Sequence, residues 1–145
     1  MIFGTDQTFG TNVSGRRVID LTTLSAAQGF IIQGDAASDY AGHSVSFAGD
    51  VNGDGFDDII VGAPGGSDGG MDAGEAYVIF GSGQTFGTDV SGRQVIDLTT
   101  LSAAQGFIIR GDTAGDYAGY SVSSAGDING DGFDDIIVGA PGGSD

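Results

Sequence analysis

One acidic pattern of nine residues, D-x-N-x-D-G-x-x-D, occurs twice in this sequence, at residues 50–58 and 127–135. Each copy has oxygen-bearing side chains at positions 1, 3, 5 and 9, and a glycine at position 6, where a loop around an ion must turn sharply. Position 7 adds a backbone carbonyl. Calcium binds roughly six to eight oxygens, so the pattern predicts one Ca²⁺ per copy. The expected ligands are Asp50, Asn52, Asp54, the Phe56 carbonyl and Asp58, and then Asp127, Asn129, Asp131, the Phe133 carbonyl and Asp135.

The pattern differs from the helix-loop-helix calcium loop at its end. That motif requires a glutamate at position 12, where this sequence has Val61 and Val138. We therefore expect the loop to close at position 9 and to run into a strand, because β-branched apolar residues follow. Asn-Gly and Asp-Gly also form plain turns, but a plain turn leaves the spaced carboxylates unexplained. Magnesium fits less well, because it keeps its waters.

The composition limits the classes of partner. The 145 residues include 20 acidic and 4 basic side chains, for a net charge of −16, which argues against nucleic acid and anionic membrane surfaces. There is no apolar run of the ~18 residues that a membrane span needs. Cysteine is absent, so disulfides and thiolate metal sites are excluded. Met1 leads straight into a repeat with no signal peptide, and we expect a secreted parent protein to have supplied one.

An internal repeat organises the chain. Residues 1–68 align with residues 78–145 without gaps, and 11 of the 68 aligned positions differ. The segment 69–77 occurs once. We therefore expect a first repeat at 1–68, an inter-repeat hairpin segment at 69–77 and a second repeat at 78–145, each repeat being cut within a structural unit.

Four segments of one period read as strands: 76–80, 106–110, 121–125 and 135–138. The link at 84–105 contains either a short strand near 95–98 or a helical turn near 102–105. Several strands are continuous apolar runs, which is typical of a sheet covered on both faces. Four short antiparallel strands per repeat, covered by neighbouring repeats, describe an all-β fold of propeller blades.

The order S-V-S-x-A-G-D-[VI]-N-G-D-G-F-D-D-I-I-V-G-A-P, followed by G-E-A-Y-V-I-F-G, resembles the FG-GAP repeat of the integrin α-subunit β-propeller. It is similar also to repeats in large secreted bacterial proteins. Residues 62–64 and 139–141 match the GAP half, whereas residues 40–42 and 117–119 keep the glycine of the FG half and move the aromatic. The resemblance implies calcium between the first and second strands of each blade, an extracellular location and adhesion through protein or glycan ligands.

Propellers of this family have about seven blades, and two blades cannot close a ring. Because the chain starts and stops within a blade, we expect head-to-tail assembly of identical chains, in which each end completes the next chain's start. Three chains would give six blades, and four would give eight. The sequence therefore predicts a homo-oligomeric ring, with no nucleic acid and no membrane insertion.

Other candidate chemistry is weak, and we expect no catalytic residue. His43 is the single histidine, and its counterpart is Tyr120. The G-x-S-x-G string at 65–69 lacks the helix that a nucleophile elbow requires. Asp57 and Asp134 neighbour a ligand on a strand, so we expect each to face solvent or cap the loop. Aromatic residues form either a sugar-binding surface or packing between blades: Tyr40, Phe47, Phe80, Phe86, Phe107 and Tyr117.

Two alternatives to an adhesion scaffold stay open. Propellers with calcium loops occur also in secreted hydrolases and lyases, which would need acids and a histidine in one pocket. The near-identity of the repeats fits equally an engineered propeller without a natural ligand.

Overall fold

A computed structural model describes residues 1–6 and 8–143 of the chain. Its contacts form two compact units. Unit 1 contains Met1–Gln33 and Gln84–Asp97, and unit 2 contains Gly34–Gly83 and Leu98–Asp145. Regular structure in the described residues consists of strands and two 3₁₀ turns, which confirms the all-β class. No helix of the described part is long and apolar enough to cross a membrane.

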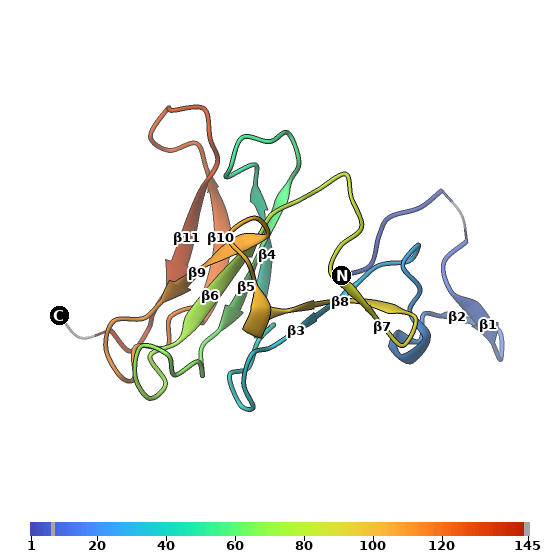
Figure 1. Ribbon diagram of the computed structural model, residues 1–145, viewed down its shortest axis with the longest axis horizontal. Helices are drawn as coiled ribbons and strands as arrows, with labels where there is room; N and C mark the ends of the chain where they lie inside the picture. Colours follow the sequence, from blue (N-terminus) through green and yellow to red (C-terminus); the bar gives the residue numbers. More distant parts are fainter. Residues whose placement is uncertain (7, 144–145) are drawn as a thin grey trace. The chain divides into compact units, whose positions relative to one another are not determined.

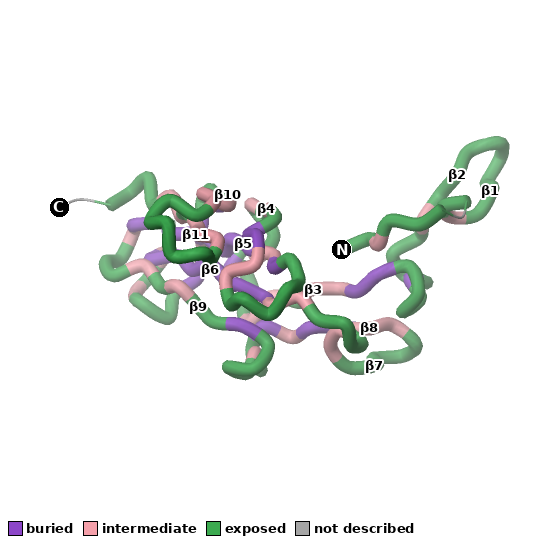
Figure 2. Tube along the Cα trace, turned by 90° about the horizontal axis from the view of Figure 1, so that it is seen from above, coloured by how far each residue is buried: buried purple, intermediate pink, exposed green. Residues whose placement is uncertain are grey.

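Unit 2 is built on a four-stranded antiparallel sheet in the order β4-β5-β6-β9 (Figure 1). The strands are β4 (Ser44–Gly49), β5 (Asp58–Ala63), β6 (Glu75–Ile79) and β9 (Gly106–Arg110). The central strands β5 and β6 are the apolar runs of the sequence, and they form the most continuously buried part of the trace (Figure 2). Four short antiparallel strands form the expected blade, and its two central strands are buried on both faces.

A second hairpin packs against this sheet through β10 (Ser121–Gly126), with β11 (Asp135–Gly139) as its partner strand. Its residues Val122, Ile136 and Val138 contact a core that includes Ala48, Ile60, Ala76 and Val78. The hairpin repeats the register of β4 and β5, including a β-bulge before the loop. Gly49 and Gly126 occupy this bulge at φ 79° and 66°, a left-handed conformation that glycine adopts without a steric penalty.

Unit 1 contains a hairpin of β1 (Thr11–Val13) and β2 (Arg16–Val18), and a three-stranded sheet in the order β3-β8-β7. These strands are β3 (Ile31–Gln33), β8 (Arg93–Asp97) and β7 (Thr88–Val90). β3 pairs with β8 in parallel, a contact that joins the two repeats and that sequence analysis missed. The 3₁₀ turn η1 (Leu21–Thr23) is capped at its N-terminus by Asp20, whose side chain accepts a hydrogen bond from the Thr22 amide.

The link at 84–105 contains both of the alternatives expected for it. β7 and β8 provide strands, and the 3₁₀ turn η2 (Leu98–Thr100) follows them. A further turn spans residues 102–105, where the Gln105 amide donates a hydrogen bond to the Ser102 carbonyl at 2.8 Å.

The blade does not follow the repeat boundaries. β4 and β5 come from the first repeat, β9 comes from the second, and β6 begins in the 69–77 segment. The division at 1–68, 69–77 and 78–145 therefore describes the sequence, and completion of a ring by further chains stays a prediction.

Candidate metal centre

Both acidic loops connect the first and second strands of a hairpin, one between β4 and β5 and the other between β10 and β11. They leave the same end of unit 2 (Figure 1). In both loops the strand that follows begins at position 9, with Asp58 or Asp135. The β-branched residues after position 9 thus form a strand, as expected.

The first aspartate of each loop is surrounded by backbone N–H groups. Asp50 accepts hydrogen bonds from Gly53 at 2.7 Å and from Gly55 at 2.9 Å. Asp127 accepts the equivalent bonds from Gly130 at 2.7 Å and from Gly132 at 2.9 Å. The loop therefore wraps around this carboxylate, and the glycines permit the turn because all four have positive φ.

Positions 3 and 5 form a chain of side-chain-to-backbone turns. Asn52 accepts a hydrogen bond from the Asp54 amide at 2.9 Å, and Asp54 accepts one from Phe56 at 2.9 Å. In the second loop the same bonds join Asn129 to the Asp131 amide and Asp131 to the Phe133 amide, at 2.9 and 3.0 Å. The two loops thus share one conformation.

Position 9 closes the loop from the strand side. The Asp58 carboxylate accepts hydrogen bonds from the Val51 amide at 2.9 Å and from the Gly81 amide at 2.7 Å. Asp58 is fully buried. Burial is the largest cause that raises the pKa of Asp58, and the negative charges of Asp54 and Asp50 raise it further. The two N–H hydrogen bonds lower the pKa and so oppose these effects. A buried carboxylate beside two others is a place where a cation lowers the electrostatic free energy.

The donor set of each loop consists of carboxylate, amide and carbonyl oxygens, the ligands that calcium prefers. The residues therefore fit a hard cation by their chemistry. The carboxylates of each loop accept hydrogen bonds from loop N–H groups. In the part of the chain that the structure describes, no three of these loop carboxylates have oxygens within 4.8 Å of one another. Among the described residues, the acidic triad with oxygens within 4.8 Å of one another is Asp35, Asp68 and Glu75, which lies outside both loops.

The two loops also contact each other. Asp134 accepts a hydrogen bond from the Asp50 amide at 2.9 Å, and its own amide donates to the Asp50 carbonyl at 3.2 Å. Asp134 thus caps the first loop, whereas the sequence predicted that it would face solvent or cap its own loop. Its counterpart Asp57 is exposed, the other expected role.

The FG-GAP repeat family matches residues 41–79 and 118–145. The chain contains FG-GAP repeats. Each match covers an acidic loop and the strands on either side of it, which confirms the resemblance drawn from the motif and implies a propeller architecture.

Similar proteins include integrin α subunits. The chain is 33% identical to integrin alpha-PS2 of Drosophila melanogaster, in a match that covers 91% of this chain and 9% of that protein. It is 40% identical to integrin alpha pat-2 of Caenorhabditis elegans, over 70% of this chain and 8% of that protein. A phosphatidylinositol-glycan-specific phospholipase D of Dictyostelium discoideum is 36% identical, over 63% and 10% respectively. The chain spans at most a tenth of the length of these relatives.

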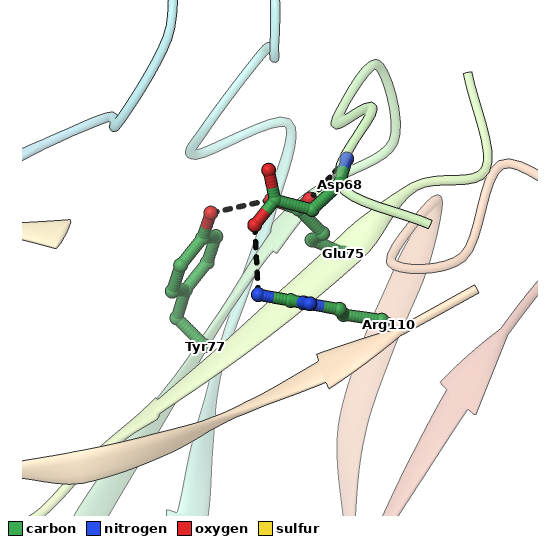
Figure 3. Close-up of polar contacts among 4 residues, drawn as sticks. All are labelled: Asp68, Glu75, Tyr77 and Arg110. Atoms are coloured by element: carbon green, nitrogen blue, oxygen red, sulfur yellow. Dashed lines mark hydrogen bonds and ion pairs between the residues drawn. The ribbon is translucent and has the colours of Figure 1, made fainter. Parts of the chain in front are cut away.

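The FG-GAP blade contains a second acidic cluster, which sequence analysis missed (Figure 3). Glu75 is 1% exposed and accepts hydrogen bonds from the Tyr77 hydroxyl at 2.5 Å and from the Asp68 amide at 3.1 Å. Arg110 forms an ion pair with Asp68 at 2.8 Å. Burial, as the largest cause, raises the pKa of Asp35. Asp35 and Arg110 are far from Glu75 in sequence, so no motif could indicate that they join this cluster.

Donors already occupy several oxygens of this cluster, and one of them is the guanidinium of Arg110. The cluster therefore serves as a polar network that fixes the connection between β5 and β6 against β9.

The aromatic residues divide between packing and an open cavity. Phe30 and Phe86 stack at 4.6 Å in unit 1, and Phe80 and Phe107 lie 6.0 Å apart in unit 2. His43 packs against Tyr120 with ring centres 4.8 Å apart. Both line an open cavity of about 400 Å³ in the FG-GAP blade region, together with Tyr40, Tyr117, Pro64, Gly65 and Asp72.

Proposed function

We propose that the chain is a calcium-binding β-propeller module of an adhesion-type scaffold. The observation that carries the proposal is the pair of acidic loops, which have different neighbours and yet share the same set of hydrogen bonds. A loop that needs an ion is under the same constraint in every repeat, whereas a plain turn is free to differ.

Calcium would neutralise the loop and hold its two strands together. Asp50, Asn52, Asp54, the Phe56 carbonyl and Asp58 would hold one ion, and Asp127, Asn129, Asp131, the Phe133 carbonyl and Asp135 the other. The protein's own contribution is the preformed loop: Asp50 and Asp127 are already fixed by backbone N–H bonds, so little ordering remains at binding. The ion is structural in this proposal, and the ligand-binding surface lies elsewhere on the module.

The adhesion role and the extracellular location rest on the relatives named integrin alpha. Extracellular calcium modules bind with dissociation constants of about 10⁻⁴ to 10⁻³ M, and the acidic surface, with net charge −16, suits that environment. The partner would be a protein or a glycan bound by loops of the module.

Isothermal titration of the purified chain with calcium tests the metal sites. We expect two ions per chain, one ion for Asp54→Asn or Asp131→Asn, and none for the double variant, because each substitution removes one charged ligand. Asp112→Asn is the matched control, since Asp112 is an exposed acid outside both loops and its loss should leave two sites. Absence of calcium binding by the unmodified chain at millimolar concentration would refute the proposal.

A second candidate function is the propeller portion of a hydrolase, which the phospholipase D relative favours. In that case the calcium sites would be the same, and the reaction would belong to a further domain. Hydrolysis of a phosphodiester substrate by the 145-residue chain itself would contradict the scaffold assignment.

A further inference from the structure

The two acidic loops touch each other at more than one point. Asp134 of the second loop accepts a hydrogen bond from the Asp50 amide at 2.9 Å, and its own amide donates to the Asp50 carbonyl at 3.2 Å. A side chain at Gly49 would collide with the Asp134 carboxylate, and one at Gly53 would collide with the ring of Phe133. The second loop therefore lies directly against the backbone of the first.

These contacts fall beside expected calcium ligands of the first loop. Asp50 is the ligand at position 1, and both of its backbone polar groups bond to Asp134. Gly53 lies between Asn52 and Asp54, the ligands at positions 3 and 5. The second loop thus holds the part of the backbone from which the ligands at positions 1, 3 and 5 project.

The repeat provides an internal comparison, because the equivalent groups of the second loop are open. None of the described atoms beyond the adjoining residues would lie within 4 Å of a Cβ on Gly126 or Gly130, the counterparts of Gly49 and Gly53. Asp57, the counterpart of Asp134, is exposed. The support of the first loop is therefore a property of the arrangement and not of the loop sequence, which is the same in both copies at every ligand position.

Asp134 is itself well placed to transmit this support. It lies between the Phe133 carbonyl and Asp135, two expected ligands of the second loop, and Asp135 accepts a hydrogen bond from the Ile128 amide at 2.8 Å. The hairpins are held together by an apolar core that includes Ile60 and Val122, to which the partly exposed Asp134 does not belong. Loss of its carboxylate should therefore leave the fold intact.

We propose that Asp134 is a positioning residue of the first calcium site, and that the second loop holds the first in its ion-binding conformation. Asp134 contacts no ion and acts through the backbone of Asp50. The inference rests on the proposed function, because both loops must bind calcium. Partners that orient metal ligands typically change metal affinity by about 10–100-fold when they are lost, since ligands fixed in advance lose less conformational freedom at binding.

Calcium titration followed by ¹H–¹⁵N NMR tests the proposal, because it reads the two sites separately. The Gly55 amide reports on the first loop and the Gly132 amide on the second, since each donates to the first aspartate of its own loop. We expect Asp134→Ala to raise the calcium concentration at the Gly55 midpoint by about tenfold or more. The Gly132 midpoint should stay within about twofold, which also shows that the variant is folded.

Asp57→Ala is the matched control, because Asp57 has the same repeat position, is exposed and likewise precedes a ligand. Both midpoints should stay within about twofold of the unmodified chain. Equal weakening of both sites by Asp134→Ala, or an effect of Asp57→Ala as large as that of Asp134→Ala, would overturn the proposal. Two calcium sites that are insensitive to Asp134→Ala would overturn this inference alone, whereas absence of calcium binding by the unmodified chain would overturn the proposed function with it.

Discussion

At the scale of single residues, the same acid has different roles according to what surrounds it. Asp58 is buried and closes a loop, while its counterpart Asp135 is partly exposed and accepts from Ile128 at 2.8 Å. Asp134 caps another loop, while Asp57 is exposed. The repeats are nearly identical in sequence, so these differences arise from neighbours and not from the residues themselves.

Asp35 gives a pH dependence whose sign follows from its surroundings. Burial raises its pKa as the largest cause, opposed by a bond from Tyr77 and reinforced by Asp39 and Glu75. The folded state thus holds the proton more tightly than the unfolded chain. Its favourable contribution is complete below the unfolded pKa and is lost as the pH rises through the folded pKa.

We therefore expect Asp35→Asn to raise the free energy of unfolding at neutral pH by up to about 1 kcal/mol. The gain should fall towards zero when the pH is lowered below the ordinary aspartate range. Urea unfolding of both proteins across this range, in chelator, provides the measurement. Asp112→Asn, at the equivalent exposed position of the second repeat, should show no such gain, and a gain that grew at acid pH would contradict the assignment.

At the scale of elements, the glycine of the GAP segment shows why a strand position excludes a side chain. A Cβ on Gly62 would lie 1.9 Å from the backbone carbonyl oxygen of Gly119, whereas on Gly139, the same repeat position, it would meet Ser121 Oγ at 2.3 Å. Backbone cannot move aside cheaply, but a serine side chain can rotate. The close approach of the chain at Gly62 therefore requires glycine.

This comparison predicts that Gly62→Ala destabilises the fold by about 2–3 kcal/mol, as expected for overpacking. Gly139→Ala should cost less than about 1 kcal/mol. Equilibrium unfolding in urea of the two variants measures the difference. Equal destabilisation would mean that the approach of Gly119 is not fixed by the blade.

The acidic loops give the second element-scale prediction, because they join the strands of two hairpins. A ligand bound to the folded state at 100 times its dissociation constant stabilises by about 2.7 kcal/mol. For a chain of this size with two such ions, chelating calcium should then lower the melting temperature by roughly 10–20 °C. The Asp54→Asn, Asp131→Asn double variant should melt at one temperature with and without chelator. An unmodified chain insensitive to chelator would show that the loops fold as plain turns.

The strands of the blade could be predicted from sequence, because their apolar β-branched runs end at glycine-rich turns. The start of each post-loop strand at position 9 was likewise set by the residues after Asp58 and Asp135. The parallel pairing of β3 with β8 and the ion pair between Arg110 and Asp68 could not be predicted. Both depend on contacts between distant segments, which leave no local period in the sequence.

At the scale of the whole molecule, unit 2 contains a complete four-stranded sheet and one further hairpin on its face. The hairpin covers Ile60 and Val78 of the sheet. Each unit of a repeat architecture buries the apolar face of the unit beside it in this way.

A heterologous contact that rotates each copy by a constant angle closes into a ring or continues as a fibre. The propeller architecture favours closure, since propellers generally carry about four to eight blades. We expect native mass spectrometry of the unmodified chain to show a trimer or a tetramer, which would supply six or eight blades, with two calcium ions per chain. A symmetric dimer as the largest species would mean that like faces meet, and would exclude a ring built by head-to-tail docking.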